Sequence, residues 1–487
     1  MQHPRSVSSD RFLEDARHLL GERGLTTDPE LMAPWLTDWR GRYTGQALAL
    51  ASPADTQEVA ALVRLCAKAG IAMVPQGGNS GMSGGATPGP DGGSVLLSLR
   101  RLDTIAPVDV AARRVTCGAG TVLQRLHEAV EREGLRFPLT LGGKGSATIG
   151  GLVSTNAGGT QVLRHGTMRA QVLGLEAVMA DGQVLDTLTP LKKDNRGFDL
   201  KQLLIGSEGT LGIVTAATLR LLPAIGGRSV MFAGLGRVTA ARELLLHAEN
   251  DIGDLLEGFE IIPRHALQSV LDHEPATRDP LNGAHSWYAL IELAADEEAL
   301  ATLEERAERF LAEAFEAELV EDATIAANET QAEALWALRD GISAAERAIG
   351  PAMQHDISVP VEKMADFVEH ALPIMDAHFP GTRAVAFGHL GDGNVHFHVL
   401  APPGAVPGEW EETEGKTISR RVHDLVTQWG GSISAEHGIG QMKRDELGRL
   451  GDPVALSILR SVKHALDPKG LLNPGKLLPL AKGDTNA

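Results

Sequence analysis

Glycine is concentrated in one stretch of this chain, and the concentration limits what that stretch can fold into. The chain has 487 residues, of which 55 are glycine. Between Gly77 and Gly212 the glycines occur in clusters. Glycine has no Cβ, so it permits positive φ and lets the backbone approach a neighbouring group closely. The stretch therefore predicts backbone that lies close against another group.

Three glycine segments carry this prediction. Residues 75–81 directly follow an apolar strand expected at 71–75, and the N–H groups of such a loop can converge on an anion such as phosphate. A simple tight turn is the alternative, which the further glycines at 84–93 make weaker. Residues 142–159 combine glycine with hydroxyl and amide side chains, a surface that suits a large flat cofactor. Residues 206–214 form the third segment.

A further glycine pair, between Cys117 and Leu123, follows a strand and opens a helix, as a dinucleotide-binding fingerprint would. Leu123 stands in place of the third glycine, and no acidic residue occurs about 20 residues on, between Gly134 and Pro138. We interpret this segment as an ordinary strand-to-helix turn, so a nicotinamide cofactor is not favoured.

The rest of the chain indicates an α+β protein of more than one domain. Asp55 is the expected N-cap of a helix that runs to Ala69, after a strand at 47–50. Glycine-punctuated strands are expected over 149–222. Beyond Pro223, helices alternate with a few strands, which is typical of an α+β domain. The helices are expected at 238–250, 296–319, 329–348, 361–377 and 414–429, and one strand at 286–293.

The net charge indicates which binding partners to exclude, and the cysteine content indicates the compartment. With 45 Lys and Arg against 63 Asp and Glu, the net charge is −18, which argues against nucleic acid and anionic membranes. An anionic substrate would need local positive charge. Cys66 and Cys117 form no disulfide framework, so a reducing compartment is expected.

No apolar run reaches the roughly 20 residues of a membrane span, and residues 1–5 lack a signal-peptide core. We expect a cytoplasmic protein.

Histidines gather in a predicted hairpin. Strands are expected at 384–390 and 395–399, joined by a Gly-Asp-Gly-Asn turn. Alternation places His396 and His398 on one face of the second strand, and His389 lies just across the turn. Histidines satisfied within a core are the alternative, but three within ten residues need a further cause.

A later segment supplies a carboxylate. Residues 430–438 are expected to end a strand with Glu436 and His437 beside glycine. Two imidazoles and a carboxylate, with one coordination position open, are typical of a catalytic divalent-metal site.

Taken in their order, these motifs resemble the FAD-linked D-2-hydroxy acid dehydrogenases, flavoprotein oxidoreductases with the vanillyl-alcohol oxidase-type FAD-binding fold. The resemblance runs from Leu48 to Lys476 and includes the D-2-hydroxyglutarate and D-lactate dehydrogenase branch. It implies an α+β fold with a two-subdomain FAD-binding domain, a ferredoxin-like α+β substrate (cap) domain that also holds the metal, and a C-terminal helical segment. The implied boundaries are a helical segment at 1–46, the FAD-binding domain at 47–223, the cap domain at 224–450 and a returning segment at 451–487.

The resemblance implies non-covalent FAD, because Asn79 and Ser80 stand where some relatives tether the flavin through histidine. The first loop would hold the pyrophosphate, Ile213 or Val214 would meet the adenine end, and Asn473 would lie near the flavin ring. The full set of implied cofactor contacts is Pro75, Gly77, Gly78, Asn79, Ser80, Gly81, Gly145, Ser146, Ile149, Gly150, Gly151, Ser154, Thr155, Asn156, Gly159, Glu208, Gly209, Gly212, Ile213, Val214 and Asn473.

The same resemblance assigns His389, His396 and Glu436 to a divalent metal, with zinc the expected ion, and His437 to the role of general base. A bound metal lowers the pKa of a substrate hydroxyl, as it does for water. A histidine with its ordinary pKa of about 6.5 can then accept the proton.

Arg339 and Ser343 are spaced to share one helical face, and the resemblance makes Arg339 the anchor of a distal substrate carboxylate. An exposed arginine on a helix is the alternative. Gln354 stands where D-2-hydroxyglutarate dehydrogenases typically carry lysine, and His398 where some relatives carry asparagine. Asn394, His398 and His437 complete the predicted substrate contacts.

D-2-hydroxyglutarate, with D-malate, is the first expected substrate, since Arg339 is present. D-lactate, glycolate or a bulkier apolar D-2-hydroxy acid is the alternative. A flavin-free metal hydrolase, a non-catalytic binding module and an oxygen-using oxidase are further alternatives. The expected partners are an electron acceptor (electron-transfer flavoprotein, quinone or cytochrome) and a second copy in a homodimer.

Overall fold

The computed structural model describes residues 7–479 and divides into two compact units. Among the described residues, the first unit comprises 7–159, 166–223 and 436–479, and the second comprises 160–165 and 224–435. The chain thus leaves the first unit and returns to it. The return begins at residue 436, before the predicted 451, because the loop that follows is bonded to Ser83 and Glu208 of the first unit.

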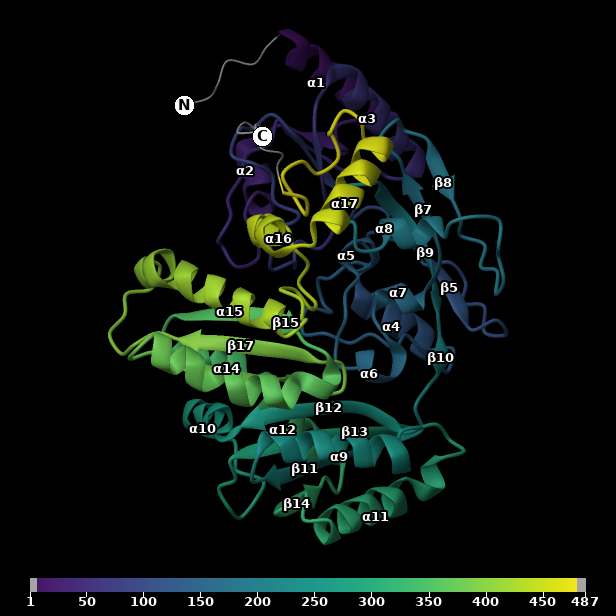
Figure 1. Ribbon diagram of the computed structural model, residues 1–487. Coiled ribbons are helices and arrows are strands. Elements are labelled where there is room, and N and C mark those ends of the chain that lie inside the picture. The colour runs from purple at the N-terminus through teal and green to yellow at the C-terminus, as the bar shows by residue number, and fades with distance from the viewer. Residues whose placement is uncertain (1–6, 480–487) are drawn as a thin grey trace. The chain divides into compact units, whose positions relative to one another are not determined.

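The first unit contains a small mixed sheet in the strand order β1-β2-β4-β3. Helices α1 and α3 of this unit lie side by side (Figure 1). Strands β2, β4 and β3 are parallel, and β1 is antiparallel to β2. Helix α3 begins after Asp55, whose side chain accepts the N–H of Glu58, so the predicted N-cap is confirmed. The bounds are α1 Val7–Leu20, β1 Leu25–Thr26, α2 Pro29–Met32, β2 Ala49–Ala51, α3 Thr56–Ala69, β3 Met73–Gln76 and β4 Val95–Ser98.

A second, antiparallel sheet completes the first unit, in the order β5-β9-β7-β8. Cys117 to Leu123 joins strand β5 to helix α4, which agrees with its interpretation as an ordinary turn. The bounds are β5 Arg114–Gly118, α4 Leu123–Glu131, β6 Leu135–Arg136, α5 Ile149–Thr155, α7 Met168–Gln171, β7 Val172–Val178, β8 Val184–Asp186, α8 Leu200–Leu204, β9 Ile213–Arg220, β10 Leu222–Pro223, α16 Arg444–Leu450 and α17 Pro453–Leu466.

The prediction of strands over 149–222 is wrong in part, because residues 149–155, 168–171 and 200–204 form helices α5, α7 and α8. Ile149, Leu152 and Val153 are buried at the i, i+3, i+4 spacing of a helix. A Cβ on Gly150 would lie 2.6 Å from the Cβ of Ala119, so glycine allows this helix to pack closely on its neighbour. The glycines here serve close packing of a helix.

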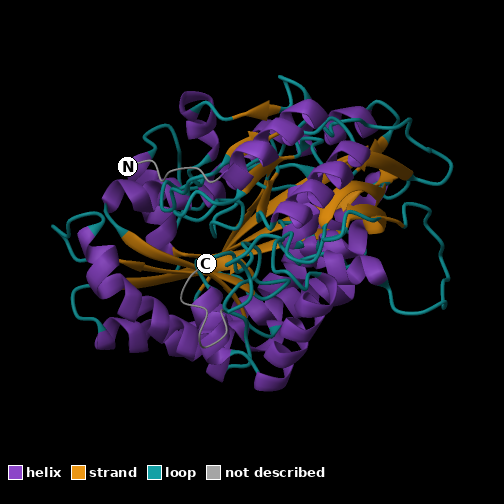
Figure 2. Ribbon diagram, turned by 90° about the horizontal axis from the view of Figure 1, so that it is seen from above, coloured by secondary structure: helices purple, strands orange, loops and turns teal. Residues whose placement is uncertain are grey.

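The second unit is built on a seven-stranded antiparallel sheet in the order β14-β11-β13-β12-β16-β17-β15. Figure 2 distinguishes the strands from the helices. Helices α10, α12 and α13 share one apolar core with strands β11, β13 and β16. The bounds are α6 Val162–His165, β11 Gly227–Leu235, α9 Val238–Asp251, β12 Leu256–Pro263, α10 Arg264–His273, β13 Trp287–Ala295, α11 Leu303–Glu316, β14 Asp322–Ile325, α12 Glu329–Asp340, α13 Ile342–Ile349, β15 Ala352–Ser358, α14 Met364–His378, β16 Arg383–His389, β17 Asn394–Leu400 and α15 Lys416–Gln428.

The predicted histidine hairpin is confirmed as β16 and β17, but two other predictions in this unit are wrong. The helix expected at 329–348 is interrupted at Gly341, so Arg339 and Ser343 belong to α12 and α13 respectively. Residues 430–438 form no strand; only an isolated bridge joins Ser432 to Ser358.

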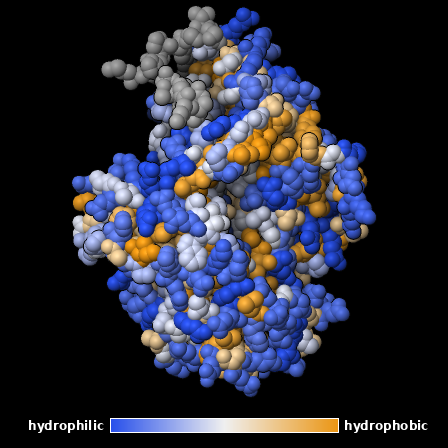
Figure 3. Space-filling view, in the orientation of Figure 1, coloured by the Kyte–Doolittle hydropathy of each residue, from blue (hydrophilic) through white to orange (hydrophobic). Residues whose placement is uncertain are grey.

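Both cysteines of the first unit are buried, and one of its helices exposes apolar side chains. Burial raises the pKa of Cys66 and of Cys117 to about 12, so both thiols are unreactive at neutral pH. Hydrophobic side chains gather over α17, where Val454, Ile458 and Leu459 are exposed (Figure 3). Within residues 7–479, no helix combines the length and the apolar character needed to span a bilayer.

Candidate functional site

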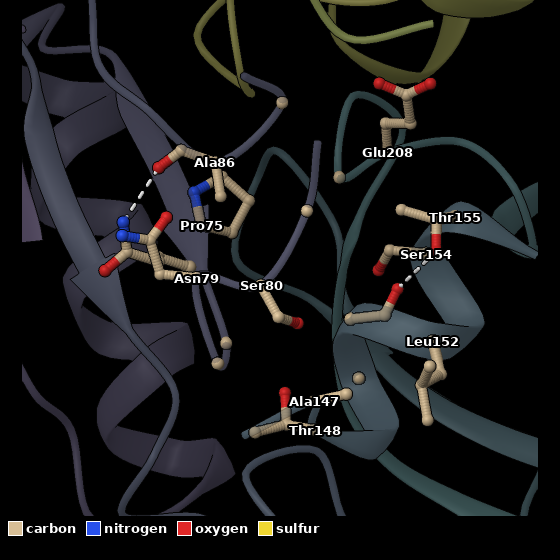
Figure 4. A pocket seen from close by; sticks show the side chains of 18 of the residues that line it. Pro75, Asn79, Ser80, Ala86, Ala147, Thr148, Leu152, Ser154, Thr155 and Glu208 are labelled. Atoms are coloured by element: carbon tan, nitrogen blue, oxygen red, sulfur yellow. Dashed lines mark hydrogen bonds between the residues drawn. The ribbon is translucent and has the colours of Figure 1, made fainter. Parts of the chain in front are cut away.

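A pocket of about 820 Å³, its open mouth included, lies among the glycine segments of the first unit. The first loop forms one wall, and helix α5 with the residues before it forms the other. Ser80 and Ser154 point into the pocket from these two walls (Figure 4). His437 and Asn473, from the returning segment, also line it. Residues remote in sequence therefore meet at one cavity.

Most of the predicted cofactor contacts line this pocket, and the others do not. Those that line it are Pro75, Gly77, Gly78, Asn79, Ser80, Gly81, Gly150, Gly151, Ser154, Thr155, Glu208, Gly209 and Asn473. Those outside its lining are Gly145, Ser146, Ile149, Asn156, Gly159, Gly212, Ile213 and Val214. Ile149, Ile213 and Val214 are buried in the apolar cores, and Asn156 accepts hydrogen bonds from Thr167 and Arg169.

Arg100 orients the first glycine loop. Its guanidinium lies 4.4 Å from the ring centroid of Trp35 and donates to the carbonyl oxygens of Gly77, at 3.3 Å, and Gly78, at 3.2 Å. Arg100 does not line the pocket, so it holds these carbonyls from outside. Asn79 adopts a φ of 52° and donates to the carbonyl of Thr37 at 2.8 Å. The loop is thus fixed before any ligand arrives.

Three polar atoms of the pocket lining are buried without a hydrogen-bond partner among the described residues: Gln76 Oε1, Thr148 Oγ1 and Asn473 Oδ1. Such atoms are rare in folded proteins unless a ligand or water satisfies them. The close approach of backbone adds to this, since a Cβ on Gly78 would lie 1.8 Å from the carbonyl oxygen of Ser146. These features fit a large polar cofactor held against the backbone.

Glu208 fixes the backbone next to His437. Its two carboxylate oxygens accept the N–H of Ile439 at 2.7 Å and of Gly440 at 2.8 Å. Burial raises the pKa of Glu208, while these two backbone N–H groups act to lower it. Gly438 has a φ of 73°, and a Cβ there would lie 2.9 Å from Glu208 Oε1. The turn after His437 therefore depends on both glycine and Glu208.

Asn473 joins the end of the described chain to the glycines that follow the first loop and to the third glycine segment. Its Nδ2 donates to the carbonyl oxygens of Gly85, at 2.9 Å, and Glu208, at 2.7 Å. Its own N–H donates to the carbonyl of Met73 on β3. Asn473 is buried and has a φ of 43°, a left-handed conformation that asparagine tolerates.

In the second unit, polar side chains gather on three neighbouring strands. His396 pairs in register with Asp356 on β15 and with Phe387 on β16. The rings of His389 and His396 lie 5.3 Å apart between centroids. The two imidazoles therefore form a polar cluster within the sheet together with Asp356.

The two histidines differ in their partners. His389 is buried, and its Nδ1 donates to Glu260. The ring nitrogens of His396 make no hydrogen bond to another residue within 7–479. Burial, with the charges of Arg339 and His389, lowers the pKa of His396 well below its usual value. A neutral imidazole with a free nitrogen is the form that binds a metal.

Among the described residues, the Arg339 guanidinium is hydrogen-bonded through its Nε only. Its Nε donates to Glu260 Oε2 at 2.7 Å, and the group lies 5.1 Å from the ring centroid of Phe387. No acceptor in the described chain bonds to its two Nη groups. Ser343, on the next helix, is partly buried. Although burial opposes ionisation of Glu260, the neighbouring His389 and Arg339 hold its pKa far below the usual range.

The other predicted substrate contacts lie on β15 and β17. Gln354 is directly opposite His398 in the register, and His398 Nδ1 bonds to Glu346 on α13 at 2.5 Å. Asn394 donates from Nδ2 to Asp356 Oδ1 and to the carbonyl of Ile357, each at 2.9 Å. Asn394 Oδ1 is buried without a partner among residues 7–479.

The position of Glu436 follows from that of the preceding residue, Ala435. Ala435, the last residue of the second unit, donates its N–H to the carbonyl of Asp356 at 3.4 Å. Asp356 is the register partner of His396, and Glu436 follows Ala435 by one peptide bond. Its neighbour His437 lines the pocket of the first unit.

Sequence reasoning missed Arg100, Glu260 and Glu346. Arg100 gives no motif signal. Glu260 could have been noticed as an acid within the apolar strand β12, and Glu346 as an acid on the apolar helix α13. Their partners lie far away in sequence, so no local spacing identifies them.

Two protein-family models match this chain. Residues 47–188 match the family described as "FAD binding domain", and residues 228–477 match "FAD linked oxidases, C-terminal domain". The chain is 36% identical to D-2-hydroxyglutarate dehydrogenase, mitochondrial, of Arabidopsis thaliana, over 95% of this chain and 80% of the relative. It is 35% identical to D-2-hydroxyglutarate dehydrogenase of Xanthomonas citri pv. viticola, over 95% of this chain and 96% of the relative.

A solved structure is similar in fold. The substrate-bound crystal structure of p-cresol methylhydroxylase aligns with a TM-score of 0.75 at 14% identity, and the alignment covers 98% of each chain. This likeness supports the predicted α+β, vanillyl-alcohol oxidase-type fold.

Proposed function

The chain belongs to the FAD-linked D-2-hydroxy acid dehydrogenases, and from this membership we propose that it oxidises a D-2-hydroxy acid, D-2-hydroxyglutarate first and D-malate second, to the 2-oxo acid. The observation that carries the proposal is His437, which lines the same pocket as the glycine loops. A proton acceptor beside a flavin site is what oxidation of an alcohol requires. The FAD-binding match speaks against a flavin-free hydrolase.

FAD is proposed to bind non-covalently in the pocket of the first unit. When bound, FAD would supply the acceptor for the hydride of the substrate Cα. Gly77 to Gly81 would hold the pyrophosphate with backbone N–H groups, because Arg100 already occupies the carbonyls of Gly77 and Gly78. Asn473 is proposed to meet the flavin ring through its unpartnered Oδ1.

A divalent metal, with zinc the proposed ion, is assigned to His389, His396 and Glu436. When bound, it lowers the pKa of the substrate hydroxyl. Support comes from His389, whose Nδ1 is held by a carboxylate, a frequent arrangement for metal-binding histidines. The unpartnered nitrogens of His396 and the position of Ala435 beside Asp356 add to it. His437 would then take the hydroxyl proton.

Substrate choice is proposed to rest on Arg339, since its two Nη groups can receive a distal carboxylate in a bidentate manner. Ser343, Asn394 and His398 are the further proposed contacts. Gln354 carries no charge, so the chain lacks the second cation that D-2-hydroxyglutarate dehydrogenases typically carry at this position. This favours D-lactate or a bulkier apolar D-2-hydroxy acid as the second candidate.

The proposed electron acceptor is an electron-transfer flavoprotein, a quinone or a cytochrome. A homodimer and a cytoplasmic location stay predictions. Hydrogen peroxide measured during turnover separates a dehydrogenase from an oxidase, because only the oxidase forms peroxide in proportion to product.

The deciding experiment is anaerobic reduction of the purified protein's flavin by a panel of D- and L-2-hydroxy acids. Bleaching by D-2-hydroxyglutarate or D-malate supports the proposal. Bleaching by D-lactate alone would support the second candidate substrate instead. Bleaching by none of the D-acids would contradict the proposed function. His437→Ala should lower the bleaching rate by about 100-fold or more with an unchanged flavin spectrum. His464→Ala, on the exposed side of α17, is the matched control.

A further inference from the structure

A single arginine on the sheet of the second unit bonds to two turns of the helix that carries Arg339. Arg228 lies on β11, and its guanidinium donates to Glu329 and, at 2.5 Å, to Glu333, both on α12. These two glutamates are four residues apart, so they lie on one side of the helix. Arg339 follows on the same helix, six residues after Glu333. The contact therefore joins the sheet to the helix that presents the proposed substrate anchor.

Glu292 of β13 bonds both to this arginine and to the helix. Its Oε2 accepts Nη1–H of Arg228 at 3.0 Å and Nε1–H of Trp336 on α12 at 2.6 Å. Trp336 follows Glu333 by three residues, which places it on the same side of the helix. Helix α12 is thus bonded to two strands through three of its side chains, those of residues 329, 333 and 336.

The bonds of Glu292 contribute more than those of the two other glutamates. Glu329 and Glu333 are exposed, so water and salt screen their ion pairs with Arg228. The side chain of Glu292 is 13% exposed and is screened less. Burial raises the pKa of Glu292, while the charge of Arg228 and the N–H of Trp336 act to lower it. Loss of Arg228 would therefore leave a largely buried carboxylate without its cation, which is destabilising.

Apolar packing alone does not determine where α12 lies along its own axis. Its buried side chains are Ala332, Leu335 and Leu338, and apolar contacts have no preferred direction. The helix is interrupted at Gly341, so α13 does not extend it in a straight line. Hydrogen bonds, in contrast, require a defined distance and angle. Since a helix rises about 1.5 Å per residue, a slip of one residue would displace Arg339 by that distance.

We propose that Arg228 and Glu292 are positioning residues that fix α12 on the sheet and thereby place Arg339 to receive a distal substrate carboxylate. The Arg339 side chain also reaches Glu260 at 2.7 Å, so its backbone has a narrow range of productive positions. The proposal rests on the proposed function, which makes Arg339 the substrate anchor. It goes further because the choice between a dicarboxylate and a monocarboxylate then depends on side chains that are not themselves proposed substrate contacts.

Arg306 of α11 provides a matched control. Its side chain is 20% exposed, against 17% for Arg228, and it donates to both carboxylate oxygens of Asp254. Its further bond is to the carbonyl of Asp251, so none of these partners lies on α12. Arg306→Met therefore removes a similar guanidinium from the same unit and leaves the contacts of α12 intact.

The test measures KM and kcat of the flavin-loaded protein for D-2-hydroxyglutarate and for D-lactate. Arg228→Met should raise KM for D-2-hydroxyglutarate by about 10-fold, comparable with the loss of one hydrogen bond to a charged group. KM and kcat for D-lactate should stay unchanged, because D-lactate has no distal carboxylate for Arg339 to bind. Arg306→Met should leave the KM for both substrates unchanged.

Two further variants separate positioning from a general loss of stability. Arg228→Met combined with Glu292→Gln removes both charges, so it leaves no unpaired charge behind if Arg228→Met alone does not fold, and the same difference between the substrates is expected. In an Arg339→Met background, Arg228→Met should raise KM for D-2-hydroxyglutarate no further, since residues that act through one contact are not additive.

An equal rise of KM for both substrates, or an unchanged KM for D-2-hydroxyglutarate in folded Arg228→Met, would overturn the proposal while the proposed function stands. An additive effect in the Arg339→Met background would also overturn it. A wild-type chain whose flavin no D-2-hydroxy acid reduces contradicts the proposed function instead. A wild-type chain that oxidises D-lactate but not D-2-hydroxyglutarate removes the anchor role of Arg339 and the positioning role together. The flavin spectrum and melting temperature of each variant show whether it is folded.

Discussion

At the scale of single residues, buried carboxylates hold the groups that are proposed to bind and react. Glu208 fixes the turn after His437, and Glu260 joins His389 to Arg339. Both are acceptors only, so each can receive donors from segments that no local pattern brings together. In the proposed function, histidine and arginine supply the chemistry, and these two glutamates are bonded to those side chains or to the backbone beside them.

We expect Glu208→Gln to lower kcat by about 10- to 100-fold with a smaller change in KM, because small displacements of a catalytic group are costly. An amide in place of the carboxylate leaves one of the N–H groups of Ile439 and Gly440 facing another donor. Steady-state kinetics on protein of known flavin content measures this effect. Unchanged kcat per bound flavin would contradict the positioning role of Glu208.

Lys476 predicts a dependence of stability on pH. Burial, with the nearby charge of Arg444, lowers its pKa from 10.5 to about 8. Between these two values the unfolded chain binds a proton that the native chain has released, so the free energy of unfolding rises with pH. The full shift corresponds to about 3 kcal/mol.

The measurement is urea unfolding of flavin-free protein between pH 7 and pH 10, for the wild type and Lys476→Met. The difference in unfolding free energy, wild type minus variant, should increase with pH. A difference that stays constant would show that burial does not depress the pKa of Lys476.

At the scale of elements, the glycine loops are held by side chains outside the pocket. Arg100 follows strand β4 and bonds to the carbonyls of Gly77 and Gly78, whereas its neighbour Arg101 bonds to the carbonyl of Ser52 at 2.6 Å. We expect Arg100→Met to raise the Kd for FAD by about 3- to 10-fold, in line with the loss of exposed hydrogen bonds.

Arg101→Met removes the same charge one residue further on and should leave FAD affinity unchanged. Fluorescence titration of flavin-free protein compares the two variants. An equal loss of affinity in both would indicate a general effect of charge on FAD binding, and the orientation of the loop by Arg100 would be excluded as the cause.

Much of this element structure could be predicted from the sequence, and the failures have a common cause. The hairpin of β16 and β17 and the cap at Asp55 depend on neighbouring residues, so their local patterns sufficed. The segment 149–155 was assigned to strands because its glycines obscured a short helical spacing. Gly341 ended a helix that its flanking sequence would have continued. Glu260 meets its partners only through tertiary contacts, which no local spacing records.

At the scale of the whole molecule, net charge opposes an anionic substrate. The chain carries a formal charge of −18, and the free Nη groups of Arg339 are a local exception. Salt shortens the reach of the overall field from about 30 Å at 0.01 M to about 8 Å at 0.15 M, while contacts at short range are screened less.

We therefore expect kcat/KM for D-2-hydroxyglutarate, a dianion, to rise by about twofold or more as potassium chloride increases from about 10 to 150 mM. For D-lactate, a monoanion, the rise should be smaller. A fall with added salt would mean that local positive charge dominates the approach of the substrate.

The order of segments around the pocket has a consequence for biosynthesis. Its walls include residues 75–86, 147–155 and 208–209, yet His437 and Asn473 follow only after the second unit has been made. At about 5–20 residues per second, a ribosome needs on the order of 10 to 40 s for that intervening stretch. A nascent chain halted before Glu436 should therefore fail to quench flavin fluorescence. We therefore expect the chain to capture its cofactor only after the second unit has been synthesised.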